Sequence, residues 1–442
     1  MNKNLNPDAV YDARSLGTPK MLVLGLQHMF AMFGATVLVP TLTGLSVSAT
    51  LLFAGLGTLL FHLLTKKKVP AFLGSSFAFL GGYFAIAPGG DPTLLPYACL
   101  GVAIAGLMYG ILSAAFKAFG VRKVMRFFPP IVTGPIIICV GLHLAPTAIN
   151  SCMDNWGIAL VAVFVVIICN IWGKGMIKII PILLGVAASY LVAALTGNVD
   201  FSAVKTAAWV GLPFQFKDTV FGLFASGNVD WSLVATAVIT ILPISLATMV
   251  EHIGDICAIS STCGENFMED PGFHRTLLGD GLATTLAALF GTPANTTYGE
   301  NTGVLNLTKV FDPRVIRIAA CFAILFSFCP KFSALIGAMP SATIGGVSLI
   351  LYGMIAAVGV RNVVENQVDF TNTRNVIIAA LILCLTIGIE FSSAGTIALG
   401  RVSLSGLAVA SIVGIALNAI LPGKDYEFVQ DDKGSTSVNF QV

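Results

Sequence analysis

Long apolar runs, separated by short polar or Gly- and Pro-containing breaks, extend over most of the chain. A helix needs about 20 mostly apolar residues to cross the hydrocarbon core of a bilayer, and the apolar runs give fourteen candidate segments. The segments cover residues 20–40, 48–64, 70–87, 95–117, 127–147, 155–173, 177–197, 234–260, 275–291, 296–310, 314–335, 340–359, 374–391 and 402–421. The pattern predicts an all-α, polytopic membrane protein.

Two of these segments, 70–87 and 296–310, are short and interrupted by Gly, Ser, Thr or Pro. The second overlaps residues 294–303, a decapeptide with one carboxylate, two Asn and three Thr between apolar runs. Backbone that is not helical at membrane depth survives only where it is buried in protein or lines a cavity. We therefore expect each segment to be a short extended stretch followed by a half-helix, whose N-terminal N–H groups face ligand oxygens.

The composition excludes a water-soluble globule. Of the 442 residues, 56% are hydrophobic and 10% are charged, with a mean hydropathy of +0.88, whereas soluble proteins have about 25% charged residues. Twenty of the 24 Lys and Arg residues lie in the tails and even-numbered loops, and the exceptions are Lys205, Lys217, Lys331 and Arg401. Because cytoplasmic loops collect Lys and Arg, both termini are predicted to be cytoplasmic. The net charge of +2 gives no sign of a nucleic acid partner.

A long polar segment, 198–233, divides the fourteen segments into seven and seven. An odd number of crossings in each half makes the halves insert with opposite orientations, so we predict a 7+7 inverted repeat. The broken third and tenth segments then correspond, and such matched breaks mark the binding site of a transporter. Residues 1–19 and 422–442 are interpreted as cytoplasmic tails and 198–233 as an extracellular linker.

Glu251 and Asp255 lie four residues apart in the eighth segment, and hence on one helix face. Ionisable groups at membrane depth usually mark a substrate or ion path. Two carboxylates so close in a low dielectric resist being ionised together, so at least one is expected to carry a proton. Alternatively, Asp255 only hydrogen-bonds nearby backbone or His28. His28 itself could bond the site carboxylates or a neighbouring helix, and Asp280 is expected near a segment end.

Glu300 follows Gly299, where the backbone can approach a ligand closely. A carboxylate accepts hydrogen bonds from ring N–H groups, and a protonated one can also donate to a carbonyl. A planar ring with alternating N–H and C=O groups, such as a pyrimidinedione, therefore suits this site. Phe77 follows Ser75 and Ser76 in the other broken segment, and it either stacks on such a ring or packs as one of 30 Phe residues.

Residues 300–309, Glu-Asn-Thr-Gly-Val-Leu-Asn-Leu-Thr-Lys, resemble the signature of the nucleobase–ascorbate transporter family. That signature is Gln, Glu or Pro, then Asn, any residue, Gly, four variable residues, Thr, and a basic residue or Gly. The pair Gln27-His28 is similar to the QH element of the family. Residues 70–79, 270–275 and 295–301 resemble the bacterial members that carry uracil, and the resemblance covers nearly the whole chain except its tails.

The resemblance implies a core domain of segments 1–4 and 8–11 and a gate domain of segments 5–7 and 12–14. The corresponding ranges are 20–147, running into the first gate segment, 148–197 for the gate, 234–335 for the core and 336–421 for the gate. It also implies uracil–proton symport across a bacterial cell membrane, by a homodimer whose core moves against its gate. The proton is the coupling ion, and no other cofactor and no metal are expected.

By position, the resemblance assigns residues to two roles. The substrate contacts are Phe77, Glu251, Gly299 and Glu300, with Ala35, Tyr298, Ser348 and Tyr352 close by. Proton coupling is assigned to Glu251, Asp255 and His28.

One position departs from the pattern of the uracil-carrying members. Asp255 stands where they commonly have His, and the purine-carrying members often have Asp there. A xanthine or urate symporter is therefore the first alternative, although Glu300 argues against it because purine-type members tend to have Gln. An anion transporter or channel is a second alternative, but neither broken segment contains the Lys or Arg that anions favour. An enzyme is remote because no HExxH, GxSxG or Cys/His cluster is present.

Overall fold

A computed structural model describes residues 9–423 except 394, 400 and 401. The first half begins with a short helix η1 (Ala13–Leu16). Its further elements are α1 (Thr18–Thr43), α2 (Val47–Leu64), β1 (Leu73–Ser75), α3 (Leu80–Ile86), η2 (Pro88–Gly90), α4 (Leu95–Phe119), α5 (Val121–Met125), α6 (Pro130–His143), α7 (Ala145–Met153), α8 (Trp156–Ile171), α9 (Met176–Ile179) and α10 (Pro181–Leu195).

The linker holds α11 (Ser202–Thr206), η3 (Phe216–Asp218) and α12 (Val220–Ala225). The second half comprises α13 (Trp231–Ile241), α14 (Ile244–Cys263), η4 (Met268–Gly272), α15 (Phe273–Leu289), β2 (Asn295–Thr297), α16 (Gly299–Thr308), α17 (Pro313–Ser327), α18 (Pro330–Gly337), α19 (Ser341–Glu365), α20 (Thr373–Glu390), β3 (Ile397–Leu399), β4 (Val402–Leu404) and α21 (Gly406–Ile420).

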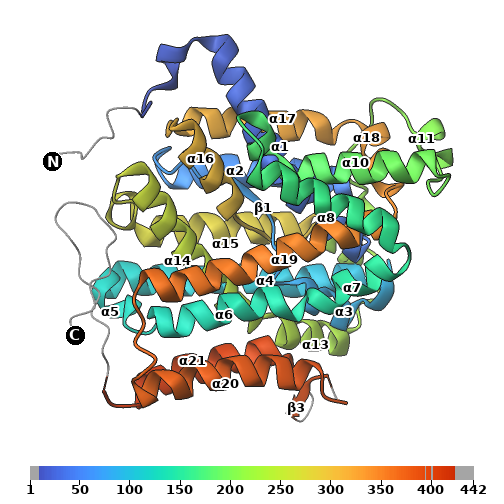
Figure 1. Ribbon diagram of the computed structural model, residues 1–442. Helices are drawn as coiled ribbons and strands as arrows, with labels where there is room; N and C mark the ends of the chain where they lie inside the picture. The colour runs from blue at the N-terminus through green and yellow to red at the C-terminus, as the bar shows by residue number, and fades with distance from the viewer. Residues whose placement is uncertain (1–8, 394, 400–401, 424–442) are drawn as a thin grey trace.

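The predicted all-α class is confirmed, because every predicted segment has a helical counterpart and most long helices share one direction (Figure 1). Among the described residues, seven helices are long and apolar enough to cross a membrane, and α17 with α18 would make an eighth despite an 86° bend. The protein is thus a multi-pass membrane protein. The number of fourteen crossings stays a prediction, because several segments are short or broken.

The packing of the helices repeats between the two halves. Helix α4 of the first half packs on α15, and in the equivalent arrangement α17 of the second half packs on α2. In the same way α8 packs on α10 as α20 packs on α21, and α8 meets α19 as α20 meets α6. These paired contacts are those expected of a two-fold relation between the halves.

The two broken segments meet each other directly. Strands β1 and β2 pair antiparallel, with Gly74 opposite Thr296. The backbone N–H of Ser76 donates to the carbonyl of Ala294 at 2.8 Å, and that of Tyr298 donates to Phe72 at 3.0 Å. Each bond runs from the residue after one strand to the residue before the other. Equivalent strands that run in opposite directions are what an inverted repeat requires.

Small residues let the helices around the strands approach closely. A Cβ atom on Gly281 in α15 would lie 2.5 Å from the carbonyl oxygen of Gly106 in α4 and 2.4 Å from the Tyr109 side chain. Gly110, one turn further along α4, faces open space. Gly106 and Gly281 therefore form the close contact between α4 and α15.

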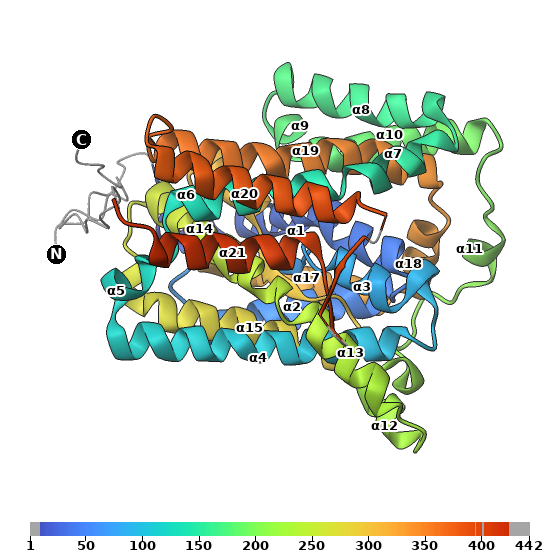
Figure 2. The same cartoon turned by 90° about the horizontal axis from the view of Figure 1, so that it is seen from below.

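The two described ends of the chain lie at the same end of the helices as α5, and α11 lies at the opposite end (Figures 1 and 2). Part of the expected N-terminal tail is packed on the protein: the Tyr11 hydroxyl donates to the carbonyl of Cys263 at 2.8 Å, and the Ala13 N–H donates to Asp312 at 2.7 Å. Residues 9–17 of the segment interpreted as a cytoplasmic tail thus include residues that bond to the rest of the protein. Residues 1–8 and 424–442 lie outside the described part.

Candidate functional site

The crossing strands bring the starts of two half-helices together near the middle of the helix bundle. Phe77 follows β1 and precedes α3, and Gly299 follows β2 and begins α16. Phe77 and Gly299 hold corresponding places after their strands. The predicted extended stretch followed by a half-helix is therefore confirmed in both segments.

Asp255 on α14 faces the start of α16. The hydroxyl of Thr297, the last residue of β2, donates to the carboxylate of Asp255 at 2.9 Å. A Cβ atom built on Gly299 would lie 3.5 Å from the other carboxylate oxygen of Asp255. Glu251 lies one helical turn earlier on α14, and both carboxylates are partly exposed. The structure therefore places Asp255 beside Gly299, with Glu251 one turn away on the same helix.

A second polar group lies buried behind the strand, and the sequence reading missed its importance. Asp280 is fully buried in the middle of α15, not near a helix end as expected. Its carboxylate accepts a hydrogen bond from Thr296 at 3.3 Å and lies 3.6 Å from the Nδ1 atom of His252. The same His252 nitrogen is 3.2 Å from the hydroxyl of Thr297. Thr296 and Thr297 thus join a buried Asp–His pair to the partly exposed Asp255.

Asp280 was wrongly expected near a segment end, because apolar runs locate the ends of a segment only to within several residues. A carboxylate that is buried needs a partner, and the partner here comes from another helix. The signal available in the sequence was the Thr296-Thr297 pair, whose hydroxyls point to opposite sides of β2 and so serve both carboxylates.

Phe77 and the wall formed by α19 contribute aromatic and hydroxyl groups. The rings of Phe77 and Tyr352 lie edge to face with centroids 5.6 Å apart. The buried hydroxyls of Ser76, Ser348 and Tyr352 have no partner of normal hydrogen-bond geometry within the described ranges. Since buried polar groups are nearly always satisfied, these three hydroxyls are candidates for contact with a polar ligand.

Tyr298 holds the crossing together. Its hydroxyl donates to the backbone carbonyl of Ser75 at 2.8 Å and accepts a bond from Thr36 on α1 at 3.2 Å. The ring also fills the space where a Cβ atom on Gly74 would stand, with atoms at 2.6 Å. Tyr298 therefore lies next to Gly299, and its hydroxyl joins the strand crossing to α1.

His28 is buried on α1 and meets α16. The amide of Asn301 lies 3.2 Å from both the Nδ1 atom and the backbone carbonyl of His28. This contact corresponds to the helix-to-helix alternative for His28. The side chains of Ala35 and Glu300 lie outside the described part of the structure, although their backbone belongs to α1 and α16. Their predicted roles stay predictions.

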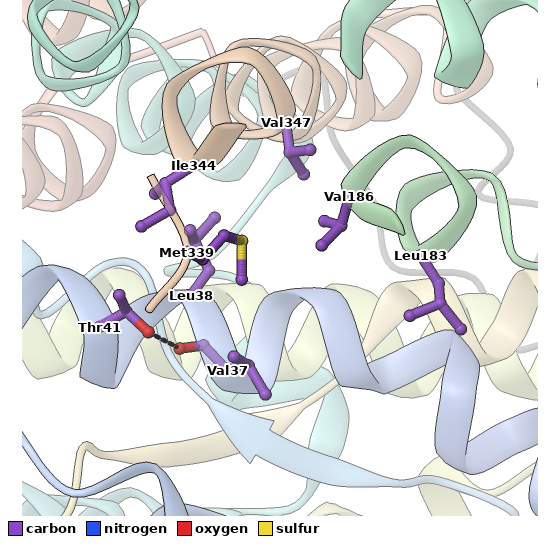
Figure 3. A pocket seen from close by; sticks show the side chains of 8 residues that line it. All are labelled: Val37, Leu38, Thr41, Leu183, Val186, Met339, Ile344 and Val347. Atoms are coloured by element: carbon purple, nitrogen blue, oxygen red, sulfur yellow. Dashed lines mark hydrogen bonds between the residues drawn. The ribbon is translucent and has the colours of Figure 1, made fainter. Parts of the chain in front are cut away.

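A small cavity of about 20 Å³ separates α1 from α10 and α19 (Figure 3). It is lined by Val37, Leu38, Thr41, Leu183, Val186, Met339, Ile344 and Val347. Its one hydroxyl, on Thr41, donates to the carbonyl of Val37 in the same helix at 2.8 Å. The cavity has room for about one water molecule, so it is not a binding site for a ring. It marks an aliphatic contact surface between α1 on one side and α10 and α19 on the other.

Comparison with known proteins decides the family. The model of the Permease family (Xan_ur_permease) matches residues 19–417. This chain belongs to that family. As a member of the Permease family it is a membrane transporter, and the site around Asp255 and Gly299 lies within the matched region.

Curated relatives cover almost all of the chain. The uracil permease of Bacillus caldolyticus is 42% identical over 415 residues, which span 91% of this chain and 92% of that protein. The uracil permease of Bacillus subtilis (strain 168) is 41% identical over 430 residues, with 92% and 94% covered. The uracil permease of Escherichia coli (strain K12) is 36% identical over 408 residues, with 90% of each covered.

Solved structures share the fold. The transmembrane domain of the cyanobacterial bicarbonate transporter BicA matches with a TM-score of 0.55 and 15% identity, over 93% of this chain and 99% of that one. The structure of SLC26A9 matches with a TM-score of 0.62 and 12% identity, over 93% of this chain and 66% of that one. At such low identity the likeness concerns the fold alone.

Proposed function

We propose that this member of the Permease family imports uracil by proton symport. The observation that carries the proposal is the site at the strand crossing, in a chain whose relatives named uracil permease are 36–42% identical over about 90% of its length. A uracil ring presents alternating N–H and C=O groups on one edge. Carboxylates accept from ring N–H groups, and hydroxyls such as those of Ser348 and Tyr352 can donate to ring carbonyls.

The ring lies between the start of α16 and the side chain of Phe77 in this proposal. Gly299 offers a bare backbone surface beside Asp255, and Phe77 offers an aromatic ring from the opposite strand. Glu251 and Glu300 bind the polar edge. Ala35 of α1 and Tyr298, which follows β2, complete the surroundings.

Asp255 and Glu251 share the transported proton. The Thr297 hydroxyl donates to Asp255 and so holds that carboxylate beside the start of α16. One proton shared by the two carboxylates lowers their combined charge from −2 to −1, and substrate binding follows. His28 contributes through Asn301, which it contacts at the side of α16.

Transport proceeds by alternating access, as the core domain moves against the gate domain. The core is the group of helices around β1 and β2, and the gate is the group that contains α6, α8, α10 and α19–α21. The aliphatic surface in Figure 3 supports this division, because sliding along it breaks few polar contacts. The protein works as a homodimer in the cell membrane with both chain ends in the cytoplasm.

On chemical grounds, both uracil and xanthine are candidate substrates for this site. Xanthine contains the same dione ring fused to an imidazole, and Asp255 supplies a further acceptor for an N–H group of such a ring. Uptake of radiolabelled uracil by cells that lack their own permease, with excess xanthine or urate as competitor, distinguishes the two. If xanthine leaves uptake unchanged, the result supports uracil as the substrate. If xanthine inhibits uptake, the result would indicate a purine as the substrate.

A further inference from the structure

The linker between the two halves was interpreted as polar, but it exposes several large apolar side chains. Three apolar residues within four positions of its loop are strongly exposed, with Trp209 at 72%, Val210 at 81% and Leu212 at 84%. This loop lies at the end of the molecule opposite the described chain ends, beside α11 and α18 (Figure 2). Exposed Trp and aliphatic side chains at the end of a membrane protein are typical of the lipid–water interface.

The loop is fixed in place on the bend between α17 and α18. The N–H of Gly211 donates to the carbonyl of Phe328 at 3.1 Å, and the N–H of Lys331 donates to the carbonyl of Ala208 at 3.0 Å. Helix α18 leaves α17 at 86°. The loop and the bend thus form one docked surface, held by backbone bonds at both ends of the turn.

A cleft of about 400 Å³ opens between this loop and the bend. Its apolar walls include Val204, Leu325, Phe326 and Leu335, with Trp209 and Lys331 at its polar side. The Leu325 side chain is 67% exposed, so the cleft continues into the outer surface of the helix bundle. A cleft that is apolar along its length and open to the bilayer accepts an acyl chain.

Lys331 is the one positively charged residue among the described residues that line the cleft. Its Nζ atom lies 4.8 Å from the centroid of the Trp209 ring, an arrangement in which the ring attracts the cation. No carboxylate within the described ranges forms an ion pair with Lys331, although such pairs are present elsewhere in the chain. The charge is therefore available to an anionic group at the mouth of the cleft.

We propose that this cleft is a binding site for an anionic phospholipid of the leaflet opposite the chain ends. One acyl chain lies along Leu325, Phe326 and Leu335, and the phosphate lies at Lys331 beside Trp209. The occupant is a lipid because the exposed apolar side chains around the cleft would otherwise stand in water. A single cation next to an apolar channel complements one phosphate with its attached chain. The site is independent of the transported substrate.

The lipid would hold α18 against the linker. Helix α18 joins the strand-crossing group of helices to α19, and the docked loop belongs to the connection between α10 and α13. Both connections between the two helix groups at this end of the molecule thus meet at the lipid site. A bound phospholipid fastens them together at the surface of the bilayer.

The test uses full-length protein in lipid vesicles with Trp209 as its only Trp. Trp156, Trp172 and Trp231 are each replaced by Phe, which is mild because their exposed fractions are 45%, 68% and 68%. Quenching of Trp209 fluorescence is measured against the mole fraction of brominated phosphatidylglycerol or brominated phosphatidylcholine. A single Lys near a membrane surface gives a preference of roughly fivefold for the anionic lipid.

We expect brominated phosphatidylglycerol to reach half-quenching at a roughly fivefold lower mole fraction than brominated phosphatidylcholine. Lys331→Gln is expected to remove this preference, and Lys217→Gln, on the same linker away from the cleft, to retain it. Glycerol phosphate, which has the headgroup chemistry without acyl chains, should not displace the lipid.

Three results would overturn the site. Equal quenching by the two lipids would mean ordinary contact with bulk lipid. Quenching by aqueous iodide but by neither lipid would mean that the loop faces water or a soluble partner. Displacement by glycerol phosphate would mean a site for free phosphate compounds.

Discussion

The hydroxyl of Thr297, at the end of β2, donates a hydrogen bond of 2.9 Å to the carboxylate of Asp255 on α14. This bond joins the strand crossing to the helix that carries both site carboxylates. The last residue of β2 therefore responds to the protonation of Asp255, because a carboxylate accepts the bond more strongly when it is ionised. In the proposed symport, substitution of Asp255 most directly separates proton coupling from substrate binding.

Asp255→Asn is expected to abolish accumulation of uracil against a gradient and to leave exchange of internal for external uracil. The amide keeps the size of the side chain and its acceptor for Thr297, but it cannot take up a proton. Since a pH difference of about one unit can drive a roughly tenfold gradient per coupled proton, accumulation should fall by about that factor. Asp91→Asn, in an exposed turn, is the control, and full accumulation by Asp255→Asn would exclude Asp255 as a proton carrier.

Gly299→Ala is expected to weaken substrate binding without weakening the fold. The new methyl group would meet Asp255 at 3.5 Å, an ordinary contact distance, but it would occupy the surface on which the ring is proposed to lie. We expect the KM for uracil to rise about tenfold or more, which corresponds to about 1.4 kcal/mol. The control is Gly110→Ala, where a methyl group meets open space on α4. An unchanged KM, with normal expression, would place the substrate elsewhere.

Asp280 is expected to support the site from behind. Asp280→Leu leaves the Thr296 hydroxyl without its acceptor and removes the partner of His252, and each buried group left unsatisfied costs about 1–3 kcal/mol. Asp280→Asn retains an acceptor for Thr296 and should cost less. Thermal unfolding of the purified proteins is expected to rank wild type above the Asn variant and the Asn variant above the Leu variant. Equal stability of the three proteins would contradict a structural role for the pair.

The contact between α4 and α15 is expected to be intolerant of a single methyl group. Gly281→Ala would place a Cβ atom 2.5 Å from the Gly106 carbonyl oxygen and 2.4 Å from Tyr109, so the two helices must separate. Overpacking of this kind costs about 1–3 kcal/mol. The melting temperature in detergent should fall for Gly281→Ala and stay near wild type for Gly110→Ala. Equal melting temperatures for the two variants would contradict the packing argument.

The N-terminal segment is expected to stay attached at neutral and mildly acidic pH. Arg14 donates hydrogen bonds to Asp12 and, with the charge of Arg314, lowers the pKa of this carboxyl well below its ordinary value. Because the pKa is lower in the folded protein, the stabilisation is complete above about pH 4 and is lost as the pH falls through the lowered value. Attachment should therefore not change between about pH 5 and about pH 8.

The same segment gives a mutational test at constant pH. Asp12→Asn removes the charge that Arg14 and Arg314 share, so trypsin should cut after Arg14 faster than in the wild type at pH values where the enzyme is active. Asp91→Asn serves again as the control at the other end of the molecule. Identical cleavage rates in all three proteins would show that the ion pairs do not hold the segment.

Much of the fold could be predicted from the sequence because the length of an apolar run is sufficient to identify a membrane helix. The broken segments could be predicted as well, since Gly74-Ser75-Ser76 and 294–303 place polar and flexible residues between apolar runs. The inverted repeat predicted that the two broken segments correspond, but it did not predict that they pair directly as β1 and β2. The register, Gly74 opposite Thr296, depends on Tyr298 filling the space above Gly74, and no local pattern encodes that contact.

The site could be predicted in part. The separation of four residues was sufficient to place Glu251 and Asp255 on one face of a helix. The burial of Asp280 beside His252 could not be predicted, because it depends on the close approach of α4, α14 and α15. The exposure of Trp209, Val210 and Leu212 was also missed, since a linker with scattered charges reads as polar although its apolar residues face outward.

The most direct test of uracil–proton symport is uptake of radiolabelled uracil into vesicles that contain only the purified protein. The interior is made alkaline relative to the outside, and uptake is compared with and without a protonophore and with excess xanthine. We expect transient accumulation that requires the pH gradient, collapses with the protonophore and is indifferent to xanthine. Uptake that only equilibrates, with or without the gradient, would contradict proton coupling, and no uptake of uracil would contradict the substrate.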